Sequence, residues 1–399
     1  MADATTVDRL GVTAPIIAAI EIRGLAATTR SNWSFLRVET DRGRVGWGEL
    51  TLRSHEGVLA AMLAQLQPAL VGRTTAELAP MRRAYPSLPS GRVGNTLFSA
   101  LDQALTDLEA QEAGVPVYAY LGAPQPRPLA GYATVNRSVT SRTPEGFAAA
   151  AAAAVAAGFT GVKIMPFDSV TPATSDGEFG RVETAKVLDR IAAVRATLGS
   201  SIRLMVDCHW RLSEAAALRF IEEVAPFRLH WLECPVPESA EWFPAIRRIR
   251  RRANERGMLL AGAENIVGVS GATPFLHGGL YDVIMPDIKY CGGYGEFGRI
   301  VAAARQAGVA ASPHNPSGPV AHAHTVHACI AFGVEEPVEQ QFAESPLFDD
   351  AVRGMLAPAL DGAFHPPRGA GLGIGVDERV LSAHPAVPVP LSLADPSFA

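Results

Sequence analysis

Three acidic residues stand at the ends of three successive apolar runs, each with the length and composition of a β-strand. They are Asp207, Glu233 and Glu264, and intervals of 26 and 31 residues separate them. Each interval is long enough for one strand, one helix and their loops, which is the repeat of a βα unit. Carboxylates at the carboxyl ends of parallel strands gather at the mouth of a (β/α)8 barrel, and oxygen ligands of this kind favour Mg²⁺ over Zn²⁺. The spacing therefore predicts a magnesium site with these three residues as ligands.

Other strand ends carry side chains that can move protons. His314 and Asp287 end neighbouring strands, so the carboxylate can orient the imidazole while the imidazole removes a proton from a carbon next to a carboxylate. His209 comes two residues after Asp207 and shares its face in an extended chain, which suits a general acid that protonates a leaving hydroxyl. The remaining strand-end candidates are Lys163 and Glu339. Any one of these residues alone could be a helix cap or a surface charge, but their repetition on consecutive strand ends indicates one functional cluster.

The elements that must position these residues alternate regularly from residue 129 onward. Eight strands are expected, at 130–135, 161–165, 202–206, 229–232, 259–263, 282–285, 309–312 and 336–338. Helical patterns lie between them, for example at 144–157, 183–197, 213–224 and 297–306. Eight βα units predict an α/β fold with a closed parallel TIM barrel rather than an open sheet.

The first third of the chain has a different order of expected elements, with strands first and helices after them. Strands are expected at 16–23, 33–40 and 44–49, followed by helices at 56–70, 75–85 and 94–113. We therefore predict an α+β domain over residues 1–128, a barrel over 129–365, and a C-terminal segment, 366–399, that packs back on the first domain.

Composition limits the class of protein. The 399 residues have a mean hydropathy of +0.13 and a net charge of −5, so neither nucleic acid nor an anionic membrane is an expected partner. Four cysteines show no CxxC pairing, which favours a reducing compartment over a disulfide framework. The N-terminus lacks the pattern of a signal peptide, and no apolar run is long enough to span a membrane. The expected location is the cytoplasm.

Three motifs could indicate other functions. Residues 293–298 match GxGxxG, but no acidic residue closes the following strand, so a tight βα turn is the better interpretation than a nucleotide site. The arginine run 247–252 is interrupted at helical spacing by an apolar residue, which indicates a solvated helix face rather than a basic recognition patch. The histidines of 322–327 fall on a barrel helix, where surface or packing roles are expected instead of metal binding.

The combined segments resemble the enolase superfamily, in particular its mandelate racemase subgroup and the acid-sugar dehydratases that are similar to galactonate dehydratase. The segments that carry the resemblance are MVDCHWRLS (205–213), WLECPVPE (231–238), AGAEN (261–265), MPDIKYCGG (285–293), SPHNPSGP (312–319), VEQQ (338–341) and GLGIGVDE (371–378). The resemblance implies a modified (β/α)8 barrel with an N-terminal α+β capping domain that the C-terminal segment completes. It also implies Mg²⁺-assisted abstraction of an α-proton, and a homo-oligomer.

The resemblance assigns roles to single residues. Asp207, Glu233 and Glu264 match the metal ligands, and Asp287 with His314 matches the base dyad. The other matches are Glu339, which binds the substrate carboxylate, Lys163, the first lysine of a KxK motif, and His209, the general acid of galactonate dehydratase-like members. Met165 replaces the second lysine of that motif, and a thioether cannot move a proton, so two-base racemisation is disfavoured. Cys234 stands where many relatives have an acid, but it should point away from the mouth.

Together with the resemblance, these observations predict that the protein is a Mg²⁺-dependent dehydratase. Its substrate would be an acid sugar, an aldonate or aldarate, and its product a 2-keto-3-deoxy acid. A racemase or epimerase of a carboxylate substrate is the first alternative, and a non-catalytic carboxylate-binding homologue is the second. Residues that could contact the rest of the substrate are Arg53, His55, Asn136 and Arg137. The segment 166–182 is long for a βα loop and could act as a lid.

Overall fold

A computed structural model describes residues 14–78, 91–123, 126–354, 358 and 362–387, and the statements below concern those residues. The N-terminal unit, residues 14–123, is called the capping domain. It begins with an antiparallel sheet of β1 (Ile17–Ala26), β2 (Asn32–Thr40) and β3 (Val45–Glu49). The turn between β2 and β3 passes through Gly43 at φ 73°, a conformation that favours glycine.

Three helices complete the capping domain: α1 (Glu56–Leu70), α2 (Arg92–Glu112) and α3 (Val117–Tyr120). Helix α2 lies almost directly on the backbone of β3. A Cβ atom on Gly48 would lie 2.1 Å from the carbonyl oxygen of Ala100, and one on Gly46 would lie 2.3 Å from that of Ala104. Only glycine permits this close contact, which holds the end of β3 against the barrel.

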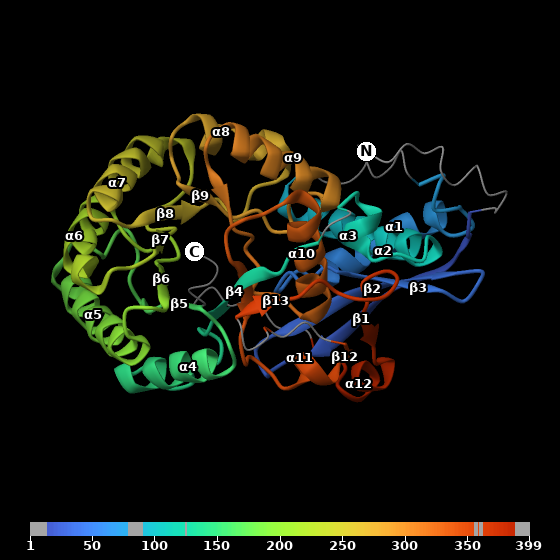
Figure 1. Cartoon of the computed structure of the whole chain (residues 1–399), viewed down its shortest axis with the longest axis horizontal. Helices are drawn as coiled ribbons and strands as arrows, with labels where there is room; N and C mark the ends of the chain where they lie inside the picture. The colour runs from blue at the N-terminus through green and yellow to red at the C-terminus, as the bar shows by residue number, and fades with distance from the viewer. Residues whose placement is uncertain (1–13, 79–90, 124–125, 355–357, 359–361, 388–399) are drawn as a thin grey trace.

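Eight parallel strands form the barrel, and Figure 1 shows them curling within a ring of helices. The strands are β4 (Leu129–Thr134), β5 (Gly161–Ile164), β6 (Arg203–Asp207), β7 (Trp231–Glu233), β8 (Leu259–Gly262), β9 (Val283–Ile284), β10 (Ala310–Ala311) and β11 (Val338–Gln341). The helices are α4 (Pro144–Ala156), α5 (Glu178–Leu198), α6 (Glu214–Val224), α7 (Phe243–Glu255), α8 (Gly268–His277), α9 (Gly293–Gln306) and α10 (Pro319–Phe332), with 3₁₀ turns at Ala225–Phe227 and Ala240–Trp242.

The barrel is modified where it closes. Strand β11 pairs with β4, while β10 and β11 share no backbone ladder in the described part of the chain. The Ser312 hydroxyl bridges that gap by donating to the carbonyl oxygen of Pro337 at 2.7 Å. A short additional strand, β13 (Ala363–Phe364), runs antiparallel to β4.

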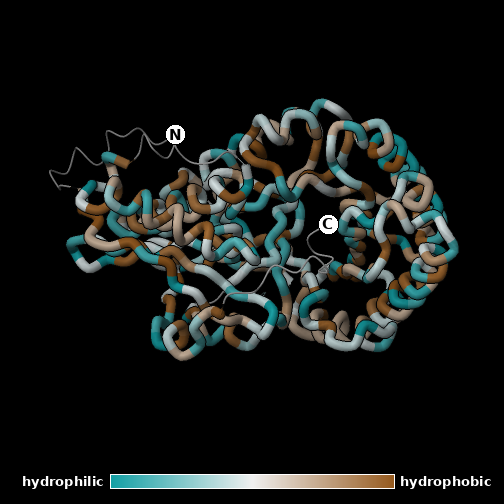
Figure 2. Tube along the Cα trace, turned by 180° about the vertical axis from the view of Figure 1, so that it is seen from behind, coloured by the Kyte–Doolittle hydropathy of each residue, from teal (hydrophilic) through white to brown (hydrophobic). Residues whose placement is uncertain are grey.

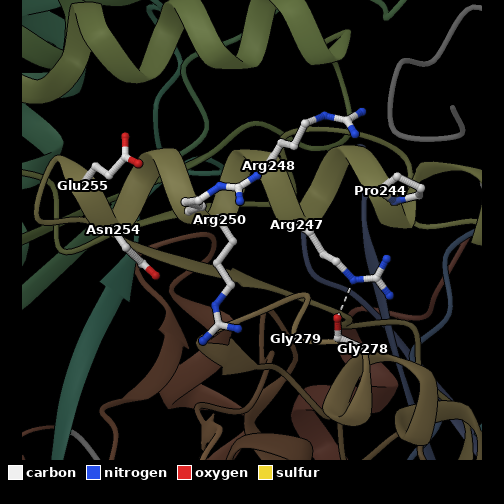
Figure 3. Close-up of a pocket in the computed structure, with 9 residues that line it drawn as sticks. Pro244, Arg247, Arg248, Arg250, Asn254, Glu255, Gly278 and Gly279 are labelled. Atoms are coloured by element: carbon white, nitrogen blue, oxygen red, sulfur yellow. Dashed lines mark hydrogen bonds between the residues drawn. The ribbon is translucent and has the colours of Figure 1, made fainter.

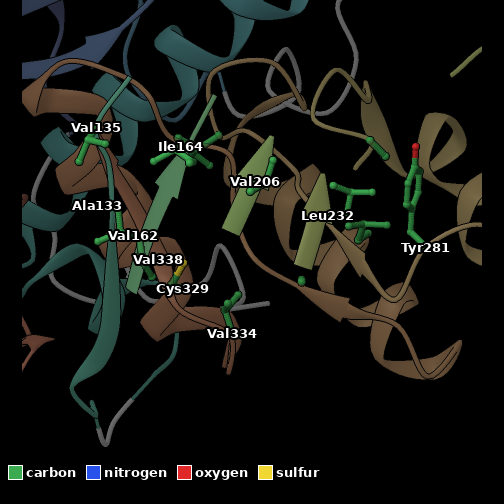
Figure 4. Close-up of a cluster of buried hydrophobic side chains, with 14 of the residues drawn as sticks. Ala133, Val135, Val162, Ile164, Val206, Leu232, Tyr281, Cys329, Val334 and Val338 are labelled. Atoms are coloured by element: carbon green, nitrogen blue, oxygen red, sulfur yellow. The ribbon is translucent and has the colours of Figure 1, made fainter. Parts of the chain in front are cut away.

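Side chains alternate between the two faces of the strands, as a period of two requires. Val162 and Ile164 of β5 belong to the large apolar layer between the strands and the helices (Figure 4), whereas Lys163 between them lies inside. Figure 2 shows hydrophilic residues on the outer side of the helix ring. The interior is filled by a separate apolar cluster that includes Tyr132, Met205 and Trp231. Polar groups inside are thus concentrated at the carboxyl ends of the strands.

The C-terminal segment returns to the capping domain. Its elements are α11 (Leu347–Asp350), β12 (Val352–Arg353), β14 (Gly375–Val376) and α12 (Glu378–Ala383). The amide of Ala26 in β1 donates to the carbonyl oxygen of His384 at 2.9 Å, and the amide of Leu372 donates to Asp107 Oδ1 in α2 at 2.9 Å. The capping domain is therefore completed by chain that comes after the barrel, as expected.

All eight expected barrel strands are present, with ends displaced by a few residues. Helix α5 begins at Glu178 rather than at 183, so the expected 166–182 loop is shorter than predicted. The helix expected at 75–85 lies mainly outside the described residues. No helix among residues 14–78, 91–123, 126–354 and 362–387 is both long and apolar enough to cross a membrane.

Candidate active site

The predicted site residues converge at the carboxyl ends of the barrel strands. In the parallel register Asp207 of β6 lies beside Glu233 of β7, and Lys163 of β5 lies beside Met205 of β6. Lys163, Asp207 and Glu233 are all buried. Glu264 follows β8 and is buried as well. The alternation of the strands directs Lys163, Asp207 and Glu233 inward at one end of the barrel, whereas Glu264 lies beyond the end of β8, directly after Ala263 in a left-handed conformation (φ 66°).

The three predicted metal ligands are close enough to influence one another electrostatically. Burial, followed by the charges of Asp207 and Glu233, raises the pKa of Glu264 well above its ordinary value. Burial also raises the pKa of Glu233, an effect that Lys163 opposes and Asp207 reinforces. In the described part of the chain, however, no three His, Cys, Asp or Glu side chains are gathered as one metal-binding group. The acids therefore lie close enough to repel one another, a repulsion that Lys163 offsets in part, but they are not arranged around a common centre.

Lys163 supplies a positive charge to two of the buried carboxylates. Its Nζ lies 2.6 Å from Glu233 Oε1 and 2.9 Å from Glu339 Oε1. The indole nitrogen of Trp231 donates to the other oxygen, Glu233 Oε2, at 2.9 Å. Both oxygens of Glu233 are thus engaged by donors from the protein. Burial would lower the pKa of Lys163, but Glu233 and Glu339 raise it well above its ordinary value, so the ammonium is charged.

His314 and Asp287 form the predicted dyad. His314 Nδ1 lies 2.8 Å from Asp287 Oδ2, and the opposite nitrogen, Nε2, lies 3.5 Å from Glu264 Oε2. The imidazole therefore lies between its orienting carboxylate and the acidic cluster. Burial lowers the pKa of His314, and the Asp287 hydrogen bond opposes this effect only in part. The imidazole is consequently neutral at pH 7, which is the state that can accept a proton.

Lys289 is a buried member of this arrangement that the sequence did not reveal. Its Nζ lies 2.8 Å from Asp287 Oδ2, and its backbone amide donates to Asp287 Oδ1 at 2.7 Å. The ammonium also donates to the hydroxyl of Ser317. Lys289 stands two residues after Asp287, just as His209 stands two residues after Asp207. This i, i+2 spacing is the sequence signal that could have identified Lys289.

Glu339 is held in place on several sides. The Thr134 hydroxyl donates to Glu339 Oε1, and the backbone amide of Asn315 donates to Oε2 at 2.8 Å. Burial would raise the pKa of Glu339, but Lys163 and His314 lower it. The side chain is therefore an anion fixed between β4, β5 and the loop that carries His314.

His209 lies in an unusual backbone conformation. Both His209 (φ 48°) and Trp210 (φ 56°) are in the left-handed region, which is costly for residues other than glycine. The amide of His209 donates to Asp207 Oδ1 at 2.7 Å, and the Nδ1 atom is buried without a hydrogen-bond partner in the described residues. Burial lowers the pKa of His209, and Asp207 opposes that change. A strained backbone that presents an unsatisfied imidazole nitrogen is typical of a functional side chain.

The capping domain contributes a carboxylate to the loop behind the dyad. Glu49, the last residue of β3, accepts hydrogen bonds from the amides of Gly318 at 2.8 Å and Ala321 at 2.7 Å. These amides belong to the N-terminus of α10, where a negative charge is stabilised. The contact fixes the segment between His314 and α10 from outside the barrel. Sequence reasoning missed it because β3 and α10 are separated by more than 250 residues.

The residues expected to contact the distal part of the substrate have mixed environments. Arg137 Nη1 lies 3.0 Å from Glu344 Oε2, and Asn136 Oδ1 accepts from Arg142 at 2.8 Å, so both side chains already have partners. His55 Nδ1 lies 2.9 Å from the carbonyl oxygen of Arg53. A substrate role for these four residues stays a prediction.

The competing motifs have structural explanations. The GxGxxG segment starts α9, and the amide of Tyr294 donates to Asp102 Oδ2 from α2 at 2.8 Å. A carboxylate of the protein therefore lies where a phosphate would have to bind. The histidines of α10 are fully buried packing residues. They do not lie on the surface.

The arginine run forms the outer face of α7, as predicted. A surface pocket between this face and the turn after α8 is shown in Figure 3, where Arg247 donates to the carbonyl oxygen of Gly278 at 2.6 Å. Several of the arginines are paired with acids, for example Arg250 with Asp282 at 2.8 Å. The pocket lies on the outside of the barrel, away from the strand ends that carry the candidate site.

Comparisons with known proteins agree with this architecture. Residues 4–122 match the family model of the mandelate racemase / muconate lactonizing enzyme N-terminal domain, and residues 146–380 match that of the enolase C-terminal domain-like family. A crystal structure of an enolase superfamily member from Polaromonas sp. JS666 superposes with a TM-score of 0.81 at 24% identity, covering 94% of this chain and 99% of that one. The 3,6-anhydro-D-galactonate cycloisomerase from Zobellia galactanivorans gives 0.78 at 22% identity, with 93% and 100% covered.

Curated relatives are similar over most of the chain. A D-galactonate dehydratase from Ralstonia pickettii (strain 12J) is 29% identical over 88% of this chain and 90% of its own length. Another, from Verminephrobacter eiseniae (strain EF01-2), is 30% identical over 74% of each chain. A D-gluconate dehydratase from Thermoproteus tenax is 28% identical over 90% of this chain and 72% of its own length. The chain is thus an enzyme of the mandelate racemase and muconate lactonizing enzyme family, within the enolase superfamily.

Proposed function

We propose that this enzyme is a Mg²⁺-dependent dehydratase that converts an acid sugar into a 2-keto-3-deoxy acid. One observation carries the proposal: a neutral, buried His314 lies between its orienting carboxylate, Asp287, and the acidic cluster at Glu264. The relatives named above as D-galactonate and D-gluconate dehydratases support the same reaction class. Assembly into a homo-oligomer and a cytoplasmic location stay predictions.

The first step is removal of the proton next to the substrate carboxylate. The Nε2 atom of His314 accepts this proton because Nδ1 is occupied by Asp287 at 2.8 Å. The electron pair of the C–H bond then moves into the carboxylate and gives an enediolate. Asp287 stabilises the imidazolium that forms, as an ionised carboxylate whose pKa Lys289 and His314 lower against the effect of burial.

The enediolate carries extra negative charge that must be stabilised. Lys163 is charged and buried at the strand ends, so its ammonium can approach the carboxylate oxygens. The donor set of Asp207, Glu233 and Glu264 fits a hard divalent cation. Burial and then the charges of neighbouring acids raise the pKa of Glu264 and of Glu233, and a bound cation would relieve the repulsion between these charges. Bound Mg²⁺ would supply Lewis-acid stabilisation of the developing oxyanion. Asp207, Glu233 and Glu264 would hold the cation, with Lys163 and Trp231 as the protein donors to Glu233.

The second step removes water. The β-carbon–oxygen bond breaks, the oxygen leaves with the bonding electron pair, and a proton from His209 converts it to water. Burial lowers the pKa of His209, so for this step the imidazole has to take up a proton from solvent when the negatively charged substrate binds and raises that pKa. The resulting enol rearranges to the 2-keto-3-deoxy acid.

The alternative reaction, epimerisation, needs a second base on the opposite face of the substrate. Met165 stands where that base is expected, and it has no proton to exchange. Proton return to the α-carbon by His314 alone would give exchange without inversion, so dehydration is the better supported outcome.

The decisive experiment is a screen of aldonates and aldarates with Mg²⁺ in D₂O, followed by ¹H NMR and a 2-keto acid assay. We expect a 2-keto-3-deoxy product from at least one substrate, and a loss of about 100- to 10,000-fold in kcat in His314→Asn, because general base catalysis is removed. His277→Asn, at an exposed position on α8, is the matched control. Deuterium incorporation at the α-carbon with inversion and no loss of water would establish the epimerase instead.

A further inference from the structure

Arg92 places a cationic group from the capping domain at the rim of the barrel mouth. It is the first residue of α2, and its Nη1 donates to Asn265 Oδ1 at 2.6 Å. Asn265 directly follows Glu264 in the chain. The guanidinium carbon also lies 5.5 Å from the centroid of the Tyr290 ring. Contacts with two different barrel loops therefore fix the position of Arg92.

Tyr290 connects this position to the proposed base. Its ring centroid lies 6.2 Å from that of the His314 imidazole. The distance from the guanidinium carbon of Arg92 to the centroid of the His314 imidazole is therefore at most the sum of the Arg92–Tyr290 and Tyr290–His314 distances. A six-carbon acid whose second carbon lies at His314 has the length needed to bring its far end to Arg92.

The charge of Arg92 is not neutralised by the groups around it. Other cations near the site are already paired: Lys163 with Glu233 and Glu339, Lys289 with Asp287, and Arg137 with Glu344. Arg92 is exposed. Among the described residues its guanidinium makes one hydrogen bond, to a neutral amide, and no ion pair with a carboxylate. Its remaining N–H groups are therefore available to an anion that enters from solvent.

We propose that Arg92 binds a second carboxylate at the far end of the substrate, so that the enzyme prefers diacid sugars (aldarates) over monoacid sugars (aldonates). This inference rests on the proposed function and specifies its substrate class. A guanidinium presents parallel N–H groups that match both oxygens of a carboxylate. The terminal hydroxyl of an aldonate offers a neutral partner and gains much less from the same contact.

A purely structural role for Arg92 predicts a different result. If the residue only ties the capping domain to Asn265, its replacement would lower thermal stability without changing the relative affinity for diacids and monoacids. The ratio of the two affinities is therefore the readout that separates the roles.

The test uses galactarate and galactonate, a diacid and a monoacid with the same hydroxyl pattern, as probes. Their binding to the Mg²⁺-loaded full chain is measured by calorimetry in a His314→Asn background, so that turnover does not interfere. The second substitution is Arg92→Gln, with Arg92→Lys as the conservative variant. Arg73→Gln is the matched control because Arg73 pairs with Glu77 on the exposed surface of the same domain.

We expect the parent to bind galactarate about 10- to 100-fold more tightly than galactonate, as one charge-assisted pair provides. Arg92→Gln should remove this preference, Arg92→Lys should retain part of it, and Arg73→Gln should leave it unchanged. Equal binding of the two acids by the parent, or an unchanged preference in Arg92→Gln, overturns the inference. If Arg92→Gln does not fold, the preference for galactarate over galactonate is compared between the parent and Arg92→Lys. A preference that is smaller in Arg92→Lys supports the inference, and an equal preference overturns it. A persisting diacid preference without turnover of any acid sugar by the wild type would refute the proposed dehydratase but not the anion site.

Discussion

Lys289 and Asp287 form a buried ion pair directly behind the His314 imidazole. The ammonium and the imidazole Nδ1 both lie 2.8 Å from the same oxygen, Asp287 Oδ2. Burial alone would lower the pKa of Lys289, but the charge of Asp287 raises it strongly. Lys289 is therefore a third member of the His314–Asp287 pair. Its ammonium holds the Asp287 carboxylate in the orientation that positions the His314 imidazole.

Replacement of Lys289 by methionine tests this relationship. The change leaves the Asp287 charge buried with one partner fewer, which costs about 3–5 kcal/mol of stability. We expect kcat to fall at least tenfold with a smaller change in KM, because the ring of His314 loses its fixed orientation. Lys289→Arg should restore part of kcat. Steady-state kinetics and thermal unfolding measure both effects, with the exposed Lys186→Met as control, and an unchanged kcat in Lys289→Met would contradict the positioning role.

The acidic cluster predicts a large response to divalent cations. Glu264, whose pKa burial and neighbouring acids raise, should bind Mg²⁺ together with Asp207 and Glu233 and thereby stabilise the fold. At 100 times the dissociation constant the gain is about 2.7 kcal/mol. Glu264→Gln should abolish this gain, yet it should melt no lower than the metal-free wild type because one repulsive charge is gone.

Differential scanning fluorimetry with EDTA or MgCl₂ measures this response directly. The exposed Glu241→Gln serves as control and should respond as the wild type does. A wild-type melting temperature that does not change with saturating Mg²⁺, Mn²⁺ or Ca²⁺ would exclude a divalent cation site.

The sequence could predict those features of the site that depend on neighbouring residues in the chain, but not those that depend on contacts between separate segments. The inward direction of Lys163, Asp207 and Glu233 follows from strand alternation and the βα repeat, so both the barrel and the position of these residues were predictable. Whether the three acids are already gathered around a metal is not a local property. Glu233 contacts Lys163 and Trp231 instead, because the buried ammonium is the available counter-charge.

Contacts between distant segments could not be read from spacing. Glu49 reaches the N-terminus of α10, and Arg92 reaches Asn265, only because α2 packs on β3 and the capping domain lies against the barrel mouth. The strain at His209 was equally hidden, since its left-handed backbone violates the extended geometry from which its direction was inferred. The backbone amide of His209 contacts the carboxylate of Asp207, and the role of the imidazole as general acid stays a prediction.

His209 should separate the two steps of the reaction. In His209→Asn the base His314 is intact, so deuterium should still enter the α-carbon of the substrate at a rate close to that of the wild type. Loss of water should slow by about 100- to 10,000-fold, the usual contribution of a general acid. ¹H NMR in D₂O follows both events in one sample. Equal loss of exchange and elimination would mean that His209 has no specific role in the departure of the hydroxyl.

The histidines of α10 should make the contact between the domains sensitive to acid. His324 Nε2 lies 2.8 Å from the carbonyl oxygen of Trp47 in β3, and its Nδ1 lies 2.6 Å from the Tyr294 hydroxyl in α9. In the neutral tautomer Nε2 donates and Nδ1 accepts, so both contacts are satisfied. Burial lowers the pKa of His324 from 6.5 to about 3. The folded state therefore holds this side chain uncharged, because a charge at this buried position is unfavourable.

The sign of the resulting pH dependence follows from proton binding. Well above pH 6.5 neither the folded nor the unfolded state binds a proton at His324, and its contribution to stability is complete. As the pH falls toward 3 the unfolded chain takes up a proton that the folded chain cannot, so stability decreases by up to about 1.4 kcal/mol per pH unit. Burial raises the pKa of Asp107 to about 6. Over the pH range below 6, protonation of this carboxyl therefore makes the folded state more stable as the pH falls, which opposes the effect of His324. A comparison of variants is therefore needed to isolate the histidine.

His324→Gln provides that comparison because a glutamine amide can also donate to one partner and accept from the other without titrating. Between pH 6.5 and 4.5 the unfolding free energy of the wild type should fall relative to this variant by about 2.3 kcal/mol. Urea unfolding at pH 7.5, 6.5, 5.5 and 4.5 measures the difference, and the exposed His277→Gln should track the wild type at every pH. Parallel curves for the wild type and His324→Gln would show that the buried imidazole accepts a proton in the folded state, and that the domain contact tolerates its charge.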